Sequence, residues 1–429
     1  MTQASPTFLI PKNKKFYGRK LMRSAILRAA TLTAAIVLTT AGSALAAGQY
    51  DPGASDTEIR IGNIMPYSGP ASAYGVIGQA EVAYFNKVND EGGINGRKVS
   101  FITYDDSYSP PATVEQARRL VEGDKVLLIF NSLGTPTNTA IQRYMNHEKV
   151  PQLFVASGAT SWNDPKHFPW TMGFQPNYQT EAAIYAKYIL QNKPDAKIAV
   201  LYQNDDYGKD YLKGLVDGLG SKASQIVAKE SYDVSEPTIA SHIVTLQASG
   251  ADVFVDVATP KFAAQSIKKV HQLGWHPMFL LNNVSASVGS VLKPAGFDSA
   301  QGIISAAYLK DPADPEWKNA ADMKAWNAFM DKYLRSADKS DASNVYAYAV
   351  TRTLVEVLKA CGNDLTRANI MKQAASLKNF DPGLLLSGIT VNNSATNFAP
   401  IHQLQLMRFE GDSWKRFGPV MSGATHTGT

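Results

Sequence analysis

The 429-residue sequence contains a single cysteine, Cys361, so no disulfide bond can form within the chain. Two nucleotide-binding signatures are absent, G-x-x-x-x-G-K-[ST] and G-x-G-x-x-G, and so is the G-x-S-x-G elbow of serine hydrolases. The seven histidines are scattered, and His271 and His276 are five residues apart, which places them on different faces of a helix and argues against a metal pair. The sequence therefore predicts no cofactor, no metal site and no catalytic centre.

An excess of basic charge is also missing from most of the chain, although the whole sequence has a formal net charge of +5. Residues 1–46 contain seven Lys and Arg and no acidic residue. Removing these seven from the total of 42 leaves 35 basic against 37 acidic residues, a net charge of −2. This balance argues against a nucleic-acid partner.

The first 46 residues have the pattern of a secretory signal. A basic segment precedes AATLTAAIVLTTAGSALA, and Ala44-Leu45-Ala46 fits the small-x-small rule for cleavage. Met22 is an alternative start, which would leave a signal of 25 residues. A membrane anchor is the competing interpretation, but the segment is rich in Ala, Thr and Gly and weak for a spanning helix. We predict a cleaved signal over residues 1–46 and export of the rest.

The remaining chain alternates segments typical of strands with segments typical of helices, which predicts an α/β fold with parallel sheets. Its length favours two domains. Strands are expected at 58–64, 97–106, 125–132, 151–157, 197–205, 225–233, 251–259, 277–283 and 302–308. Helices are expected at 76–90, 111–122, 137–148, 178–192, 208–219, 237–249, 261–273, 286–295, 316–335, 343–361 and 364–376. A strand-rich tail is expected from Leu384, with a hairpin around residues 410–412.

Gly, Ser, Thr, Asn and Tyr are concentrated where predicted strands lead into helices. The loop PYSGPASAYG, residues 66–75, is one example, and it could be a plain turn, a phosphate cradle or the wall of a small-molecule site. In open parallel sheets, ligands bind at these carboxyl ends of the strands. Similar loops are expected at 131–138, 156–162, 204–208, 257–262 and 282–287.

Residues 61–121 carry three spacings that together are specific: SGP-x-x-x-YG, N-x-x-GGI-x-GR and YDD-x-x-x-P. With the segment LYQNDDYGKDYLKGLVDGL, they resemble the periplasmic binding proteins of branched-chain amino-acid ABC transporters, the leucine/isoleucine/valine-binding type. The resemblance covers residues 57–420.

The resemblance implies the type I periplasmic binding fold, in which two Rossmann-like lobes are joined by three crossover segments and enclose the ligand. It places the crossovers near 173–177, 306–308 and 388–390. The first lobe would then comprise residues 57–175 plus 307–387, and the second residues 176–306 plus 388–420.

The resemblance also implies a set of ligand-binding residues. Tyr74 would line the pocket from the first lobe, Gly134 and Thr135 would hold the ligand carboxylate with Thr160, and Tyr207 would contribute from the second lobe. Each of these has a structural alternative, as a packed aromatic residue, a tight turn or a helix cap.

Departures from the family pattern affect the part of the site that receives a ligand ammonium. Acidic residues of amino-acid binders match Asn283 and either Asn177 or Tyr178, and a tyrosine that closes the pocket matches Thr259. A buried ammonium without a carboxylate partner is costly. A carboxylic acid without the ammonium, aromatic or branched aliphatic, therefore fits these residues better.

We thus predict a monomeric, soluble periplasmic ligand-binding protein that is not an enzyme and hands a small carboxylate to a membrane permease. The alternative ligand is a branched-chain amino acid. A secreted α/β enzyme is the alternative of another class, and it would need a base beside Asp206 and Tyr207. The sensing module of a receptor would need a membrane span or a signalling domain, and the sequence has neither.

Overall fold

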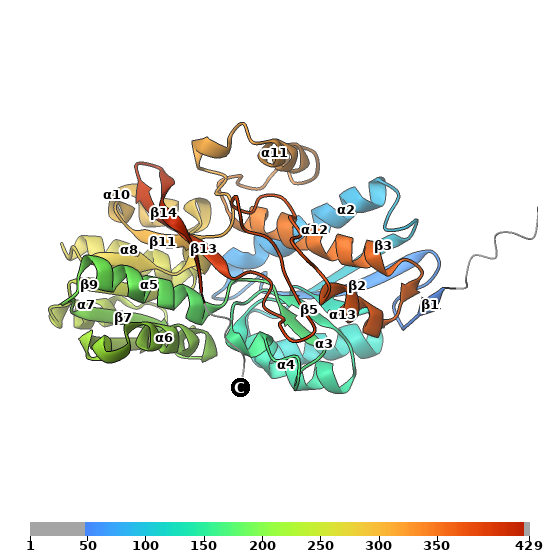
Figure 1. Ribbon diagram of the computed structural model, residues 1–429, viewed down its shortest axis with the longest axis horizontal. Coiled ribbons are helices and arrows are strands. Elements are labelled where there is room, and N and C mark those ends of the chain that lie inside the picture. The colour runs from blue at the N-terminus through green and yellow to red at the C-terminus, as the bar shows by residue number, and fades with distance from the viewer. Residues whose placement is uncertain (1–47, 424–429) are drawn as a thin grey trace, which may run out of the picture. The chain divides into compact units, whose positions relative to one another are not determined.

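Five parallel strands form one sheet of the computed structural model, which describes residues 48–423 (Figure 1). The signal predicted over residues 1–46 lies outside the described residues. The strands follow the order β3 (Lys98–Asp105), β2 (Glu58–Met65), β4 (Leu128–Phe130), β5 (Gln152–Val155) and β6 (Thr171–Gly173). Strand β2 lies between two neighbours, and its Ile59, Ile61 and Ile64 are fully buried, as its alternating pattern predicts.

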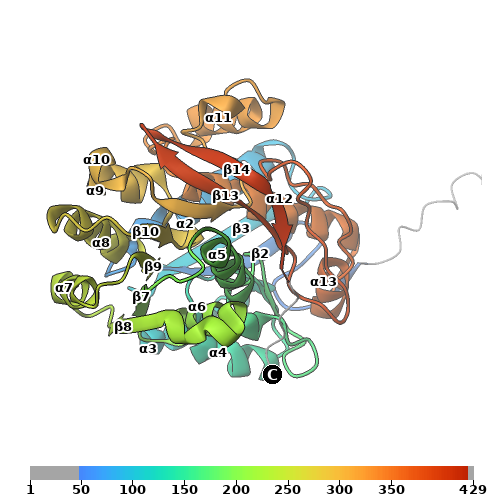
Figure 2. The same cartoon turned by 60° about the vertical axis from the view of Figure 1, so that its left-hand side comes forward.

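A second sheet contains seven strands and is mostly parallel. Its order is β14 (Ser413–Ser422), β13 (Gln403–Glu410), β11 (Ile304–Ala307), β10 (Met278–Leu281), β9 (Val253–Val257), β7 (Ile198–Gln203) and β8 (Ile226–Tyr232). Strands β13 and β14 form the predicted hairpin, and it joins the sheet antiparallel to β11 (Figure 2). The sheet is thus parallel except at this edge.

Helices cover both sheets. They are α2 (Gly75–Asp90), α3 (Pro110–Arg118), α4 (Thr135–His147), α5 (Tyr178–Asn192), α6 (Asp206–Leu219), α7 (Ala240–Ala248), α8 (Pro260–Gln272), α9 (Lys293–Ala295), α10 (Phe297–Ala300), α11 (Ala321–Tyr333), α12 (Ser343–Cys361) and α13 (Arg367–Ala374). In the first sheet, α2 packs with α12 on one face and α3 with α4 on the other (Figure 1). In the second sheet, α5 packs with α6, and α7 with α8.

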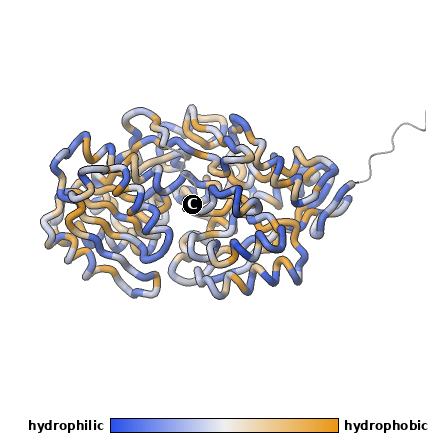
Figure 3. The backbone as a smooth tube through the Cα atoms, turned by 60° about the horizontal axis from the view of Figure 1, so that its bottom comes forward, coloured by the Kyte–Doolittle hydropathy of each residue, from blue (hydrophilic) through white to orange (hydrophobic). Residues whose placement is uncertain are grey.

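The main strands and helices form where the sequence places them, because apolar runs alternate with amphipathic segments. Figure 3 shows hydrophobic and hydrophilic residues interspersed along the chain. The lone Cys361 is a buried, free thiol at the end of α12. Among residues 48–423, no helix has the length and apolar character needed to cross a membrane.

Local details differ from the predictions. The helix expected at 286–295 forms over residues 288–295, but its first five residues (Val288–Leu292) are π-helical and only the short α9 is α-helical, and Gly296 with φ of 93° ends it. The strand-rich tail begins at Gln403 rather than Leu384, and residues 384–402 contain only isolated bridges. The short strand β6 and the pair β1 (Gln49–Tyr50) and β12 (Asp364–Leu365) were not expected.

Candidate functional site

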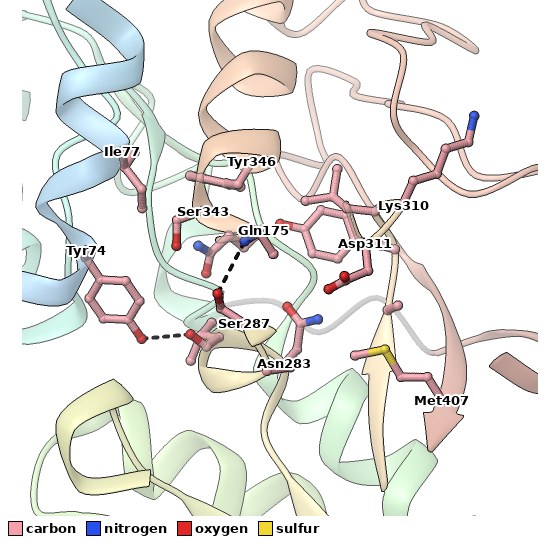
Figure 4. Close-up of a pocket in the computed structure, with 16 residues that line it drawn as sticks. Tyr74, Ile77, Gln175, Asn283, Ser287, Lys310, Asp311, Ser343, Tyr346 and Met407 are labelled. Atoms are coloured by element: carbon pink, nitrogen blue, oxygen red, sulfur yellow. Dashed lines mark hydrogen bonds between the residues drawn. The ribbon is translucent and has the colours of Figure 1, made fainter. Parts of the chain in front are cut away.

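Loops at the carboxyl ends of strands from both sheets surround a cavity with two chambers. We call the first the tyrosine chamber. It encloses about 360 Å³, and its lining includes Tyr74, Tyr108, Tyr178, Tyr207, Gly134, Thr135 and Thr259. We call the second the Asp311 chamber. It encloses about 650 Å³, and its lining includes Asn283, Tyr308, Lys310, Asp311, Ser343 and Tyr346 (Figure 4). Both chambers are lined by Tyr74, Ile77, Gln175 and Val284. The chambers therefore adjoin at these four residues, and we call this boundary the passage.

Tyr74 connects the loops that follow the two sheets, at the edge of the cavity. It ends the 3-10 turn Ser72–Tyr74 after β2 and is 9% exposed. Its hydroxyl donates a hydrogen bond of 3.0 Å to the carbonyl of Val284, which follows β10 of the second sheet (Figure 4). The loop at 66–75 is therefore a wall of the cavity, and a plain turn does not describe it.

Three more tyrosines, Tyr178, Tyr207 and Tyr211, pack on one another beside this wall. The rings of Tyr178 and Tyr211 stack with centroids 4.7 Å apart, and Tyr207 meets Tyr178 edge-on at 5.2 Å. Aromatic pairs of this geometry are rigid and contribute about 0.5–1.5 kcal/mol beyond the burial of their area. The chamber therefore offers a fixed apolar and aromatic surface to a ligand.

A cluster of hydroxyl groups lies at one end of the tyrosine chamber. The hydroxyls of Thr135 and Ser157 are 2.7 Å apart. The oxygen of Ser157 accepts hydrogen bonds from the indole N–H of Trp162 at 2.9 Å and from the backbone N–H of Ala159 at 3.2 Å. Because both lone pairs of Ser157 are occupied, its proton is directed to Thr135. The proton of the Thr135 hydroxyl is then free to donate elsewhere.

The phenol of Tyr178 completes this cluster. Burial raises its pKa to about 12, so the phenol keeps its proton. Tyr178 lines the tyrosine chamber together with Thr135. The hydroxyl protons of Thr135 and Tyr178 can therefore donate to an oxygen of a ligand.

The neighbours of Gly134 leave no room for a side chain at this position. Its φ of 103° lies in the region that favours glycine, and a Cβ atom there would lie 2.5 Å from the ring of Tyr108 and 2.6 Å from the hydroxyl of Thr137. It is the residue before α4, whose N-terminus carries the positive end of the helix dipole. Glycine at this position therefore allows Tyr108 to line the chamber.

From the second sheet, Tyr207 and Thr259 line the tyrosine chamber, and their polar groups are engaged. The Tyr207 hydroxyl lies within hydrogen-bond distance of the side-chain amide of Asn282. Thr259 donates its backbone N–H to the Tyr232 hydroxyl at 3.0 Å and its hydroxyl to Gln203 at 3.3 Å. These residues offer shape and neutral polarity to a ligand, and no charge.

Asn283 lines the Asp311 chamber and is held from behind by Glu181 of α5. Its backbone N–H donates to Glu181 at 2.7 Å, and its side chain donates to the carbonyl of Ala306 at 2.5 Å. Glu181 also accepts from the hydroxyls of Tyr185 and Tyr211, each at 2.7 Å. Burial raises the pKa of Glu181 to about 7, and these hydrogen bonds limit the rise.

Thr160 and Asn177 lie outside both chambers. Thr160 donates its backbone N–H and its hydroxyl to the carboxylate of Asp210 in α6, at 2.9 and 2.8 Å. Asn177 caps α5, and its side-chain oxygen accepts from the N–H of Gln179 at 2.9 Å. The ligand-binding residues predicted from the sequence therefore do not all lie in one chamber. Tyr74, Gly134, Thr135, Tyr207 and Thr259 share the tyrosine chamber, Asn283 and again Tyr74 line the Asp311 chamber, and Thr160 and Asn177 line neither.

Sequence reasoning missed several lining residues: Tyr108, Gln175, Tyr308, Asp311 and Tyr346. Tyr108 could have been found, because it follows Asp105-Asp106 at the end of a predicted strand, as ligand-binding residues do in parallel sheets. Asp311 follows β11 in a segment without a recognisable motif, so only the folded chain brings it to the cavity.

Two sheets with ligand-sized chambers at their strand ends define a protein that encloses a small molecule, and no metal-binding group of His, Cys, Asp and Glu occurs within residues 48–423. The family model described as periplasmic binding protein matches residues 58–413. The chain belongs to this family, in its type I branch, the branched-chain amino-acid (Leu/Ile/Val) binding proteins of ABC transporters. Members are substrate-binding components of these transporters and are not enzymes, so the alternative of a secreted enzyme is set aside.

Individual relatives agree with this assignment. Leu/Ile/Val-binding protein homolog 1 of Brucella abortus is 26% identical over 345 residues, which are 79% of this chain and 88% of the relative. A branched-chain amino acid ABC transporter structure from Thermus thermophilus with bound valine has a TM-score of 0.79 at 16% identity, covering 87% of this chain and 98% of that one. A fatty acid ABC transporter substrate-binding protein from Thermomonospora curvata has a TM-score of 0.74 at 20% identity, covering 88% and 96%.

Proposed function

We propose that this protein is the periplasmic ligand-binding component of an ABC importer and captures a small carboxylic acid, aromatic or branched aliphatic, between two closing lobes. The lobes are those predicted above, residues 57–175 plus 307–387 and 176–306 plus 388–420. The acid is then delivered to a membrane permease. Export by the signal at residues 1–46 and a monomeric state are parts of the same proposal.

The observation that carries the proposal is the character of the tyrosine chamber. Its described lining contains no Lys, Arg, Asp or Glu, and it includes the hydroxyls of Tyr178 and of Thr135, the latter paired with Ser157 at the N-terminus of α4. Hydroxyls and a helix N-terminus stabilise a carboxylate, and tyrosine rings bury an apolar or aromatic body. A carboxylic acid with an apolar body matches both ends of this chamber.

An α-amino acid brings an ammonium group directly beside its carboxylate, and this chamber provides no carboxylate for it. Glu181 lies behind Asn283, and its oxygens already accept three hydrogen bonds. Desolvating an ammonium without an ionised partner is unfavourable by several kcal/mol. For this reason we favour an acid that lacks the α-ammonium.

A branched-chain amino acid is the second candidate. The relatives named above as Leu/Ile/Val-binding, and the one crystallised with valine, favour it. The relative named as a fatty acid substrate-binding protein shows that the same fold serves a carboxylic acid in at least one other protein. We prefer the carboxylic acid because the lining of the tyrosine chamber contains no acidic residue to pair with an ammonium group.

A thermal-shift screen tests the proposal, because a ligand that binds only the folded state raises the melting temperature by mass action. We expect benzoate-type, phenylpropenoate-type and branched aliphatic acids to raise it, and leucine, isoleucine and valine to have little effect. Thr135→Val keeps the shape of the side chain and removes its hydroxyl, so it should weaken acid binding about tenfold. A large shift with leucine and none with the acids would favour the amino-acid candidate and reject ours.

A further inference from the structure

The Asp311 chamber contains a carboxyl group that the proposed function does not use. Asp311 is only 9% exposed, and its side chain points into the chamber from the segment after β11 (Figure 4). One of its oxygens accepts the backbone N–H of Ala313 at 2.8 Å. The other oxygen accepts no hydrogen bond from a residue of the described range. This oxygen faces the chamber, so a donor group of a bound ligand can reach it.

The neighbouring lysine does not supply this partner. The ammonium of Lys310 points away from the chamber (Figure 4). It forms an ion pair with Asp322 at 2.5 Å and lies 5.1 Å from the centre of the Trp317 ring. Two other nearby acids are engaged in shaping loops. Asp314 accepts the N–H of Glu316 at 3.0 Å, and Asp341 accepts from Ser287 at 2.9 Å and from the N–H of Ser343 at 3.0 Å.

A second polar atom at the passage between the chambers is also unsatisfied. The side-chain oxygen of Gln175 is buried and has no hydrogen-bond partner in the described structure. Gln175 lines both chambers, whereas Thr135 lines only the tyrosine chamber and Asp311 only the other. Acceptors without a protein donor therefore lie at Gln175 and Asp311, whereas the donor hydroxyls of Thr135 and Tyr178 lie in the tyrosine chamber.

We infer that Asp311 is a second recognition residue, which accepts a hydrogen bond from a hydroxyl or amine at the end of the ligand opposite to its carboxylate. The ligand class is then an elongated acid with a carboxylate at one end, an apolar or aromatic middle beside the residues that both chambers share, and a hydrogen-bond donor at the other end. This inference rests on the proposed function and narrows it. It also gives the unpartnered oxygens of Asp311 and Gln175 a role in selecting the ligand.

Matched pairs of acids test the inference by calorimetry. The pairs are benzoate with 4-hydroxybenzoate and 4-aminobenzoate, and phenylpropenoate with its 4-hydroxy and 4-amino forms. Asp311→Asn retains an oxygen for the N–H of Ala313 and replaces the free acceptor by a donor. We expect the unsubstituted acids to bind the variant as they bind the natural protein. The preference for the substituted acid of at least one pair should fall about three- to tenfold, which is the effect of losing one hydrogen bond.

Asp314→Asn is the matched control, since this acid lies three residues further along the same loop, is 5% exposed and does not line either chamber. It should leave the preference unchanged, and the melting temperatures of both variants verify their folding. Equal binding of every substituted and unsubstituted acid by the natural protein, or a preference that survives Asp311→Asn, would overturn the inference and leave the proposed function intact. Failure of all these acids and of branched aliphatic acids to bind the natural protein would overturn both.

Discussion

Asp210→Asn should weaken ligand binding although Asp210 lines neither chamber of the cavity. The carboxylate lies on α6 of the second sheet and accepts two hydrogen bonds from Thr160, which follows β5 of the first sheet. It also accepts one bond from Gln179 of the neighbouring helix α5. If the lobes separate to admit the ligand, the bond to Gln179 persists, whereas the two bonds to Thr160 form only on closure.

The size of the effect follows from these bonds. A hydrogen bond to a charged group contributes about 1.5–3 kcal/mol. Asp210 and Thr160 are both partly exposed, and an asparagine retains one acceptor oxygen, so we expect a loss of about 1–2 kcal/mol in the free energy of closure. Because apparent affinity scales with the population of the closed form, the dissociation constant should rise about five- to thirtyfold.

Calorimetry with the best acid from the thermal-shift screen measures this change. Asp217→Asn is the control, because Asp217 lies on the same helix, is exposed and forms an ion pair with Lys213 of that helix at 2.5 Å. Thr160→Val should act in the same direction, and the double variant should show less than the sum of the two effects, since both remove the same contact. An unchanged dissociation constant in Asp210→Asn, with the fold intact, would refute the role of this contact in closure.

Three further outcomes are expected. Gly134→Ala should lower the free energy of unfolding by about 1–3 kcal/mol and weaken ligand binding, because the new Cβ would lie 2.5 Å from the Tyr108 ring and the backbone φ is 103°. An unchanged melting temperature would contradict this. Burial raises the pKa of Asp256 to about 8. The folded state therefore keeps a proton that the unfolded state loses from about pH 4 upward. The free energy of unfolding consequently falls as the pH rises to 8. Asp256→Asn should therefore gain melting temperature over the natural protein more at pH 8 than at pH 5, and a gain independent of pH would reject this titration. Small-angle scattering should give a smaller radius of gyration with a bound acid than without, and tight binding with an identical scattering curve would count against lobe closure.

Most of the fold could be predicted from the sequence because its signals are local. The alternation of β2 and the amphipathic pattern of α12 are each fixed within a single segment. Strand β6 has only three residues, too few for a period to be visible, and its pairing with β5 depends on the folded sheet. The helix expected at 286–295 forms over residues 288–295, but its apolar pattern does not show that its first five residues are π-helical.

The site was predictable where it lies on strand ends and not where distant segments meet. Tyr74, Thr135 and Tyr207 each follow a strand and line the tyrosine chamber. The contact of Thr160 with Asp210 joins residues 50 positions apart, and no motif connects them. Asp311 reaches the cavity only because its segment leaves β11 at the cavity's edge.

The hydrogen bonds that hold Asn283 limit how this protein could acquire a different ligand over evolutionary time. A glutamate at position 283 would lose the bond to Ala306, and its carboxylate would lie on the residue whose N–H is 2.7 Å from Glu181. Two acids so close in a buried place repel each other, and one of them would stay protonated. A single substitution is therefore a poor route from an acid binder to an amino-acid binder. We expect descendants that made this change to have altered positions 181 and 283 together, so these two positions should vary as a pair among relatives with different ligands.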